Sequence, residues 1–284
     1  MRQRLVAKVE SSENRAPAST AADCASSSAD LQVNPLKAKL AAGGIVAGIW
    51  QDIPSAPVTG TLAVAGFDFV ILDCEHGGWD FGALDAAISA AEEGGAAPIV
   101  RAPGPDAFFI QRVLDLGADG IVVPQIPDAD AATRAVAMAH FAPVGKRGYN
   151  PYTRGGHYGI KPQPKLERGY PFTGVLVESP AAAAHLPAIV AVADLDLVYL
   201  GVFDYSVALG IPGEVDDPRV QAFVADATRI ARAAGKAVGT TAMNRAQTER
   251  LTKLGVNVLL YGADTWLIGK AAQEGLAMFA EFRR

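Results

Sequence analysis

Several features are scarce in this chain of 284 residues, and each scarcity excludes a class of protein. Only two cysteines are present, Cys24 and Cys74. They are too few for a disulfide framework, fit a reducing compartment and predict a cytoplasmic protein. No apolar run reaches the roughly 20 residues that a membrane span needs. The formal net charge of −5 disfavours binding to nucleic acid or anionic lipid. We therefore expect neither a nucleic-acid partner nor a membrane partner.

The beginning of the chain differs in composition from the rest. Residues 11–30, SSENRAPASTAADCASSSAD, are rich in Ala and Ser, mixed in charge and without apolar periodicity. Such a segment cannot repay the entropy of ordering, so we predict a disordered tail over residues 1–34. Hydrophobic residues make up 50% of the whole chain, and a chain of this length can bury a single large core. Residues 35–284 are therefore predicted to form one domain.

From about residue 36, short apolar runs alternate with longer segments of helical periodicity. This alternation predicts a parallel sheet covered by helices, and eight such units favour a closed (β/α)8 TIM barrel over an open sheet. The clearest helix covers residues 218–234, with Asp217 as its N-cap, Pro218 in its first turn and Gly235 as its C-cap. The eight predicted strands cover residues 44–50, 67–73, 97–102, 119–126, 174–179, 195–201, 236–241 and 256–262.

Polar residues gather at the carboxyl ends of the predicted strands, where (β/α)8 barrels form their active sites. Asp73 alone could cap the next helix, and Trp50 could be a packing residue. Arg101 could simply pair with Glu75. The convergence of the whole set on one rim nevertheless predicts an active site. The set comprises Trp50, the DCEH sequence of residues 73–76, Arg101, Glu178 and Asp204.

Two carboxylates in this set are candidates for a metal site. Glu178 and Asp204 follow adjacent strands, and two carboxylates completed by water and substrate oxygens are the usual ligands of Mg²⁺ or Mn²⁺. A zinc site is disfavoured, because the four histidines form no H-x-H or H-x-x-x-H pair. His140 and His185 fall in helical patterns, and the role of His157, in a loop, stays open.

Lysine is missing from the interior of all eight predicted strands. A Schiff-base aldolase on this fold needs a strand lysine that points into the barrel, so covalent imine chemistry is disfavoured. Cys74, with His76 as its base, is an alternative nucleophile. A small thiol beside a strand end is more often a packing residue.

The chain resembles a known enzyme family in six segments: FDFVILDCEHGGWD, IVRAPGPDAFFIQRVLDLGADGIVVPQI, PVGKRG, VLVES, VYLGVFDYSVALGIPG and YGADTWL. Together they are similar to the metal-dependent class II pyruvate aldolases of the HpcH/HpaI family, whose type member cleaves 4-hydroxy-2-oxo-heptanedioate. The resemblance extends from residue 36 to the C-terminus, in the family's order. It implies a divalent cation, Mg²⁺ or Mn²⁺ with Co²⁺ as a further candidate. It also implies a homo-oligomer, either a hexamer or a trimer of dimers.

The resemblance further implies roles for individual residues. His76 matches the family's catalytic base, and Arg101 matches the arginine that stabilises the enolate. Asp115 matches an aspartate that raises the basicity of the histidine. The remaining implied roles are metal binding by Glu178 and Asp204, and substrate binding by Trp50, Gly201 and Phe203.

Two positions depart from the family pattern. Leu176 stands two residues before the first metal ligand, where the family usually has Gln, and Phe203 stands where a small residue helps to seat the substrate. The metal ligands and the base are retained. We therefore expect the departures to affect the choice of substrate.

The predicted activity is reversible retro-aldol cleavage of a 4-hydroxy-2-oxo acid to pyruvate, or a related 2-oxo acid, and an aldehyde. A cation chelated by the oxo acid polarises its carbonyl, Arg101 adds a fixed positive group at the same oxygen, and His76 moves the C4 hydroxyl proton. The same site could instead decarboxylate oxaloacetate or cleave a malyl-CoA-type ester, and a phosphosugar isomerase is a more distant alternative. Outside enzymes, the chain could be an inactive barrel that binds a metabolite.

The longest connection, residues 141–173, joins a helix to the fifth predicted strand. It is too long to be idle in a compact domain, and members of the resembled family exchange a C-terminal helix between subunits. We therefore predict that it is largely interface, with a solvated loop as the alternative. Asp115 is expected near the bottom of its own barrel, out of reach of His76 in the same chain. It would then act across a subunit interface, or else close a helix or pair with Arg112.

Overall fold

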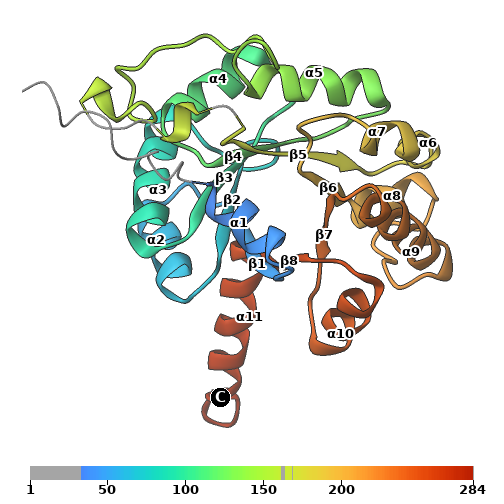
Figure 1. The fold of residues 1–284 in the computed structure, drawn as a ribbon. Helices are drawn as coiled ribbons and strands as arrows, with labels where there is room; N and C mark the ends of the chain where they lie inside the picture. Colours follow the sequence, from blue (N-terminus) through green and yellow to red (C-terminus); the bar gives the residue numbers. More distant parts are fainter. Residues whose placement is uncertain (1–32, 161–163, 168, 284) are drawn as a thin grey trace, which may run out of the picture. The chain divides into compact units, whose positions relative to one another are not determined.

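The structure is a computed structural model that describes residues 33–160, 164–167 and 169–283. Eight parallel strands pair in chain order and close into a barrel, which confirms the predicted (β/α)8 fold (Figure 1). Residues 1–32 of the predicted tail lie outside the described residues. The strands are β1 (Val46–Gln51), β2 (Phe69–Asp73), β3 (Ala97–Arg101), β4 (Gly120–Val123), β5 (Phe172–Val177), β6 (Leu197–Leu200), β7 (Ala237–Thr241) and β8 (Val258–Ala263).

Helices follow the strands and cover the barrel (Figure 1). They are α1 (Pro35–Ala41), α2 (Ala56–Val64), α3 (Phe81–Gly94), α4 (Ala107–Asp115), α5 (Ala129–Ala139), α6 (Pro180–Ala184), α7 (Leu186–Val190), α8 (Val202–Ala208), α9 (Pro218–Ala233), α10 (Arg245–Leu254) and α11 (Asp264–Ala277). The described residues also contain three short 3-10 helices: η1 (His157–Gly159), η2 (Pro164–Leu166) and η3 (Ala280–Phe282). Within this described part, no helix combines the length and the apolar character that crossing a membrane would require.

Local sequence explains where the elements begin and end. Asp217 caps α9 by accepting a hydrogen bond from the backbone N–H of Arg219 at 2.8 Å, as predicted. The predicted C-cap is one residue off, because Ala234 is the cap and Gly235 follows it with a φ of 76°. The largest strand difference is at β4, which ends at Val123 rather than residue 126. Pro124 lacks an N–H to continue the ladder, and Gln125 turns the chain with a φ of 58°.

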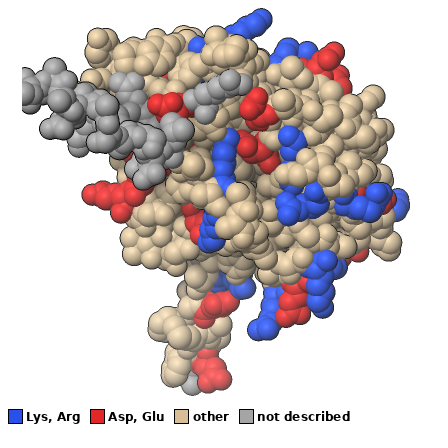
Figure 2. All heavy atoms as spheres, viewed as in Figure 1, with Lys and Arg blue, Asp and Glu red and all other residues tan. Residues whose placement is uncertain are grey.

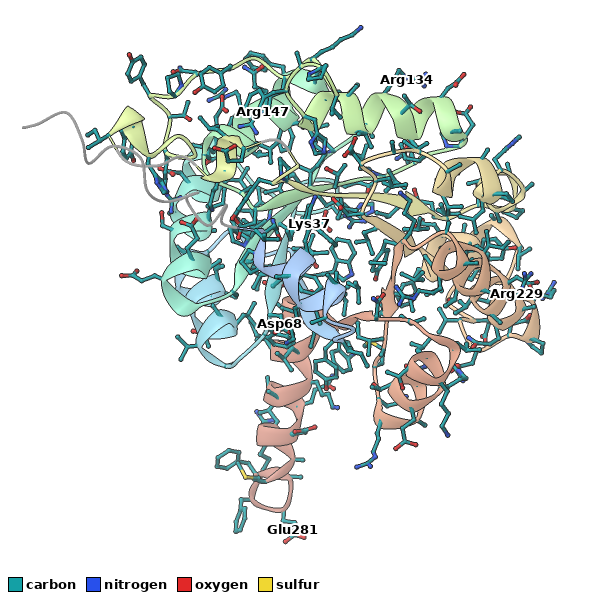
Figure 3. The ribbon with its side chains drawn as sticks, viewed as in Figure 1. Lys37, Asp68, Arg134, Arg147, Arg229 and Glu281 are labelled. Carbon is teal, nitrogen blue, oxygen red and sulfur yellow. The ribbon has the colours of Figure 1, made fainter. Side chains whose placement is uncertain are left out.

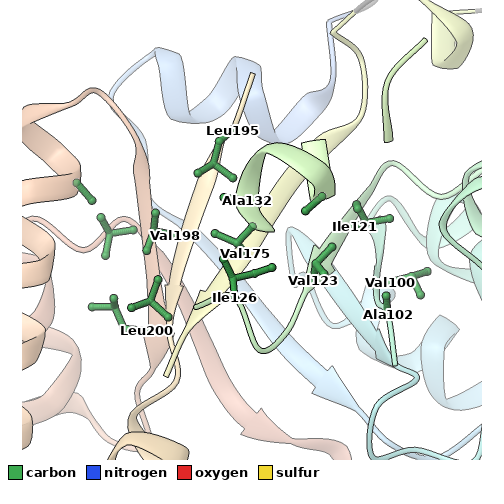
Figure 4. Close-up of a cluster of buried hydrophobic side chains, with 14 of the residues drawn as sticks. Val100, Ala102, Ile121, Val123, Ile126, Ala132, Val175, Leu195, Val198 and Leu200 are labelled. Atoms are coloured by element: carbon green, nitrogen blue, oxygen red, sulfur yellow. The ribbon is translucent and has the colours of Figure 1, made fainter. Parts of the chain in front are cut away.

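The core has two layers. Inside the barrel, side chains from alternate strand positions fill the interior, among them Phe69, Ile99 and Leu176. Between the strands and the surrounding helices lies the larger cluster, part of which is shown in Figure 4, where Val175 and Val198 of the strands lie with Ala132 of α5. Burial of these apolar surfaces provides the main stabilisation, at roughly 25 cal/mol per Å². It fixes the direction of each strand and therefore the position of each carboxyl end.

A polar layer closes the barrel at the amino ends of the strands. Each even-numbered strand is preceded by Asp or Asn, namely Asp68, Asp119, Asp196 and Asn257. Three of these side chains accept a hydrogen bond from the backbone at the start of the preceding odd-numbered strand. Lys37 of α1 pairs with Asp196 at 2.8 Å, and Figure 3 labels Lys37 and Asp68 in this region. Figure 2 shows basic side chains beside acidic ones on the same face.

Candidate functional site

A cavity of about 460 Å³ opens at the carboxyl ends of the strands. It contains most of the residues that the sequence predicts for the site, although Glu178 lies beside it and Asp115 is remote from it. Its lining is formed by Trp50, Asp52, Asp73, His76, Arg101, Leu176, Tyr199, Gly201, Val202, Phe203, Asp204, Thr241, Met243, Gly262, Ala263 and Trp266.

Arg101, the last residue of β3, is held from two sides at the floor of this cavity. Its Nε donates to Oδ1 of Asp73 at 2.8 Å, its Nη2 pairs with Oδ2 of the same carboxylate, and its Nη1 lies 3.0 Å from Oε2 of Glu75. The Trp50 ring lies under the guanidinium, with 4.4 Å from Cζ to the ring centroid. Only 10% of the Arg101 side chain is exposed, so its orientation is fixed before substrate binds.

Asp73 binds Arg101 and does not cap the next helix. Its Oδ1 also accepts the backbone N–H groups of Glu75 and His76, which holds the turn after β2, while the N-cap of α3 is Asp80. Burial alone would raise the pKa of Asp73, but the hydrogen bonds and charge of Arg101 outweigh it and lower the pKa. The alternative of Asp73 as a helix cap is therefore wrong, and the pairing of Arg101 with Glu75 is present alongside the site.

His76 lies at the edge of the cavity, in the turn that Asp73 holds. Its side chain is 66% exposed, and its Nε2 is 4.0 Å from Oε2 of Glu75. This carboxylate is the same one that contacts Arg101. The imidazole is thus accessible to a substrate in the cavity and lies close to an acidic side chain.

Glu178 and Asp204 follow the neighbouring strands β5 and β6, and Glu178 lies against Gly201, the residue that follows β6. Glu178 directly follows β5, whereas Asp204 lies in the first turn of α8. A Cβ atom added at Gly201 would lie 2.6 Å from Cβ and 3.1 Å from Oε2 of Glu178, so only glycine leaves room for this carboxylate. Burial raises the pKa of Glu178, and the negative charges of Asp204 and Glu75 raise it further.

Gln125 joins the two halves of the site, and it was not among the residues predicted from the sequence. Its backbone N–H donates to Oε1 of Glu178 at 2.6 Å, and its side-chain Nε2 donates to Oε1 of Glu75 at 3.1 Å. Both contacts depend on the positive φ of 58°, which nothing in the sequence PQIP signals. Glu75 could have been found from the sequence, because it lies inside the DCEH segment.

A hydrogen-bonded chain of neutral groups supports the far wall. Trp50 Nε1 donates to the hydroxyl of Tyr199 at 3.2 Å, and this hydroxyl lies 2.7 Å from Oγ1 of Thr241. The Trp50 and Tyr199 rings pack edge to face at 5.3 Å. These contacts fix Trp50 against Arg101. Leu176, the first departure from the family pattern, also lines the cavity, and Phe203, the second, is 49% exposed at its mouth.

Asp115 lies elsewhere, at the end of α4. Its Oδ1 accepts a hydrogen bond from Arg147 Nη2 at 2.7 Å, and the Arg147 side chain is 1% exposed. Figure 3 labels Arg147 beside α4 and α5. The alternative pairing with Arg112 is wrong, since the Arg112 guanidinium lies over the Phe81 ring, 3.7 Å from its centroid. A role for Asp115 toward the histidine of another subunit stays a prediction.

The site residues fit a divalent cation with few protein ligands. Among the residues that the structure describes, no three His, Cys, Asp or Glu side chains are grouped to hold a metal ion. A cation held by two carboxylates, with the remaining positions left for water and substrate, needs no such group. The space at Gly201 and the like charges of Glu178 and Asp204 agree with that arrangement.

The fold and the site are those of a (β/α)8 barrel enzyme. The carboxyl rim of the closed barrel carries an anchored arginine, an accessible histidine and two neighbouring carboxylates. The comparison with protein families identifies the particular kind. Residues 47–271 match the model of the HpcH/HpaI aldolase/citrate lyase family, and the chain belongs to that family. The resemblance of the six sequence segments is thereby confirmed.

Three known proteins similar to this chain carry aldolase names. A 2-keto-3-deoxy-L-rhamnonate aldolase of Klebsiella pneumoniae is 31% identical, over 87% of this chain and 93% of its own length. A pyruvate aldolase of Rhizobium etli is 30% identical, over 88% of this chain and 99% of its own length. The crystal structure of an HpcH/HpaI aldolase from Desulfitobacterium hafniense superposes with a TM-score of 0.81, at 28% identity over 87% of this chain and 96% of that one.

Proposed function

We propose that this protein is a metal-dependent lyase that cleaves a 4-hydroxy-2-oxo acid reversibly to pyruvate, or a related 2-oxo acid, and an aldehyde. Membership of the family and the aldolase relatives confirm the predicted class, a carbon–carbon lyase. The observation that carries the proposal is the anchored Arg101, which faces the same cavity as His76 and Asp204. Retro-aldol cleavage needs these groups together, namely a base and a fixed cation at the oxygen that gains charge.

Glu178 and Asp204 would hold the divalent cation, Mg²⁺ or Mn²⁺ with Co²⁺ as a further candidate. Their carboxylate oxygens are hard ligands, and the absence of a side chain at Gly201 leaves room for the Glu178 carboxylate. The chemistry supplied by such a cation, when bound, is polarisation of the 2-oxo group. Zinc is disfavoured because no histidine lies among these ligands.

The side chains of the chain supply the remaining steps. Arg101 keeps one N–H on each terminal nitrogen free of its carboxylate partners, and these donors can bind the oxo oxygen on which negative charge develops. His76 accepts the proton of the C4 hydroxyl at Nε2 or Nδ1 as the C3–C4 bond breaks and the aldehyde leaves. It returns the proton to C3 to form pyruvate, or an equivalent acid does so. Trp50 closes one face of Arg101 and keeps water from it.

A homo-oligomer is part of the proposal. Asp264 is the one residue of α11 that the described structure buries, and Ile268, Leu276, Phe279 and Phe282 at the end of the chain are exposed. Figure 1 shows α11 extending away from the barrel. Exposed apolar residues on a helix that extends from the barrel support association with a second copy. We propose the cytoplasm as its location, since Cys74 is a free thiol.

The proposal is tested by a screen of 4-hydroxy-2-oxo acids with pyruvate release as the readout. Each reaction is run with Mg²⁺, with Mn²⁺, and after exhaustive chelation. We expect pyruvate and aldehyde in equal amounts, and only with a divalent cation. Carbon dioxide from oxaloacetate without any aldol cleavage would replace the aldolase assignment by a decarboxylase. Binding of pyruvate without turnover of any substrate would indicate an inactive barrel.

A further inference from the structure

The cavity has room for more than a 2-oxo acid, and the side chains of its walls indicate the chemical character of the aldehyde half of the substrate. Its volume of about 460 Å³ falls within the roughly 300–1,000 Å³ of small-molecule sites. Among the described residues that line it, Arg101 is the one Lys or Arg, whereas Asp52, Asp73 and Asp204 are acidic. The charge balance of the lining is therefore negative.

Arg101 has no capacity for a second carboxylate. Its Nε and Nη2 contact Asp73 and its Nη1 contacts Glu75, which leaves two N–H groups directed elsewhere. These suffice for the 2-oxo acid end of a substrate. A carboxylate on the aldehyde end would be desolvated close to acidic side chains, with no further Lys or Arg among the described residues of the cavity lining to pair with it.

An apolar wall faces the remaining space, built from the segments that follow β6, β7 and β8. Phe203, Met243 and Trp266 contribute its side chains. Gly262, with a φ of 55°, lets Met243 and Trp266 approach, because an added Cβ would lie 3.2 Å from Sδ of the first and from Cε3 of the second. The Trp266 ring is held in turn by Tyr261, edge to face at 5.5 Å.

This wall offers few hydrogen bonds to a hydroxylated chain. The hydroxyl of Thr241 is bonded to that of Tyr199, and Met243 presents a thioether. Lys270 lies 5.1 Å from the Trp266 ring centroid, but it is outside the cavity lining. Substrate hydroxyl groups placed against this wall would lose hydrogen bonds to water and gain only apolar contacts, which is unfavourable in free energy.

We propose that the aldehyde half of the substrate is uncharged and apolar, and that it packs on Phe203, Met243 and Trp266. The inference rests on the proposed aldolase function and names the substrate class of that site. It distinguishes this chain from an enzyme for dicarboxylated or polyhydroxylated substrates, because neither a second cation nor a row of hydrogen-bond partners is present on this wall.

The test measures kcat/KM for addition of pyruvate to three aldehydes at saturating Mn²⁺. The aldehydes are succinic semialdehyde, the hydroxylated glyceraldehyde, and 4-methylpentanal, in which an isopropyl group replaces the carboxylate of the first. We expect 4-methylpentanal to be preferred by at least about tenfold, because burial of a polar group without a hydrogen-bond partner is costly; tenfold corresponds to about 1.4 kcal/mol. Preference for either other aldehyde would overturn the inference and leave the aldolase function standing. Absence of product from all three would overturn the aldolase function as well.

A gain of charge gives a second, independent readout. Met243→Arg places a cation on the wall and should shift the ratio of kcat/KM values toward succinic semialdehyde by about tenfold or more, with the KM of pyruvate unchanged. Leu254→Arg is the matched control, since Leu254 is an exposed residue of α10 outside the cavity lining, and it should leave the ratio unchanged. An unchanged ratio in a folded Met243→Arg protein would show that the aldehyde does not contact this wall.

Discussion

Charged side chains at the two ends of this barrel are arranged in opposite ways. On the amino side of β4, each buried cation meets its own carboxylates. Lys165 lies 2.8 Å from Asp119 and also pairs with Glu92, and Arg147 lies 2.7 Å from Asp115. Burial raises the pKa of Asp119 even though the charge of Lys165 lowers it, so removal of the lysine would leave a costly buried group. Each of these cations thus has a carboxylate partner of its own.

At the carboxyl rim, several carboxylates share the one guanidinium of the described cavity lining. Asp73 and Glu75 both contact Arg101, while Glu178 and Asp204 have no basic partner among the ion pairs of the described residues. Burial is the main cause that raises the pKa of Glu178, and the charges of Asp204 and Glu75 raise it further against the lowering effects of the Gln125 N–H and Arg101.

The contrast separates charges that stabilise the fold from charges that serve chemistry. Balanced pairs at the amino side cost stability when one partner is lost, because the other stays buried. The carboxylates at the rim that lack a basic partner repel one another in the free protein, and a bound cation would relieve this repulsion. Substitutions at the rim should therefore reduce turnover at little cost in stability, and substitutions at the amino side should do the reverse.

The largest effect is expected from Glu178→Gln. Turnover should fall by about 10³-fold, because a Lewis acid contributes several kcal/mol and each 1.36 kcal/mol is tenfold. The metal-free protein should at the same time become more stable by about 0.5–2 kcal/mol, since one repelling charge is removed. Steady-state rates and thermal unfolding in a chelator measure both. Glu249→Gln, at an exposed pair with Arg245 on α10, is the control. Full turnover in Glu178→Gln would remove the residue from the metal site.

Arg101→Lys should be nearly as damaging to the reaction. A flexible ammonium cannot reproduce the fork that contacts Asp73 and Glu75 and still presents donors to substrate. We expect a loss of about 10²–10³-fold in kcat, the usual effect of removing one oxyanion donor. The folded state should survive, as circular dichroism would show. Arg229→Lys, at an exposed side chain of α9, is the matched control. Near-normal turnover would reduce Arg101 to a structural ion-pair partner.

The fold could be predicted from the sequence because the barrel depends on patterns that repeat along the chain. Continuous apolar strands, capping residues such as Asp217 and polar residues at strand ends all carry local signals. Rim residues from separate strands follow from the topology alone. The sequence therefore predicted that His76, Arg101 and Asp204 line one cavity.

The contacts inside the site could not be predicted in the same way. Gln125 reaches Glu178 only through a backbone conformation with positive φ, and Tyr199 supports Trp50 from the far side of the barrel. The partner of Asp115 was also missed, since Arg147 lies in a long connection whose path is set by tertiary packing. Such contacts depend on distances between elements, which periodicity does not encode.

Asp115→Ala tests the amino side of the comparison. It leaves the buried Arg147 guanidinium without its carboxylate, and Arg147 Nε already lacks a partner among the described residues. We expect a loss of about 3 kcal/mol in the free energy of unfolding. Denaturant titration measures it, with Asp226→Ala at an exposed ion pair of α9 as the control. An unchanged midpoint would mean that the pair contributes nothing to stability.

The same residue tests whether subunits share a site. Asp115→Asn keeps the side-chain volume and removes the charge. The Asp115→Asn protein is mixed with the His76→Ala protein under conditions that allow subunit exchange. If Asp115 acts on the histidine of a neighbour, some mixed interfaces contain both intact groups and activity returns. No recovery, with exchange established by mass spectrometry, would leave Asp115 with its structural pairing to Arg147 alone.

The smallest effect is expected at Gln125, where backbone and side chain make separate contacts. Gln125→Gly keeps the N–H that binds Glu178 at 2.6 Å and tolerates the φ of 58°, but it loses the side-chain bond to Glu75. We expect kcat/KM to fall by about five- to tenfold, in line with a hydrogen bond worth about 1–1.5 kcal/mol.

Gln125→Ala removes the same side chain and retains a Cβ in the left-handed region, so it should lose an additional 1–2 kcal/mol or so of stability relative to Gln125→Gly. Equal turnover in the two variants, with different unfolding midpoints, would assign the kinetic effect to the link with Glu75 and the stability effect to backbone strain. Calorimetric titration with Mn²⁺ supplies the deciding measurement. Affinity should be retained in both variants if the backbone N–H alone orients Glu178, and a joint loss of affinity would show that the Glu75 link also holds the metal ligand in place.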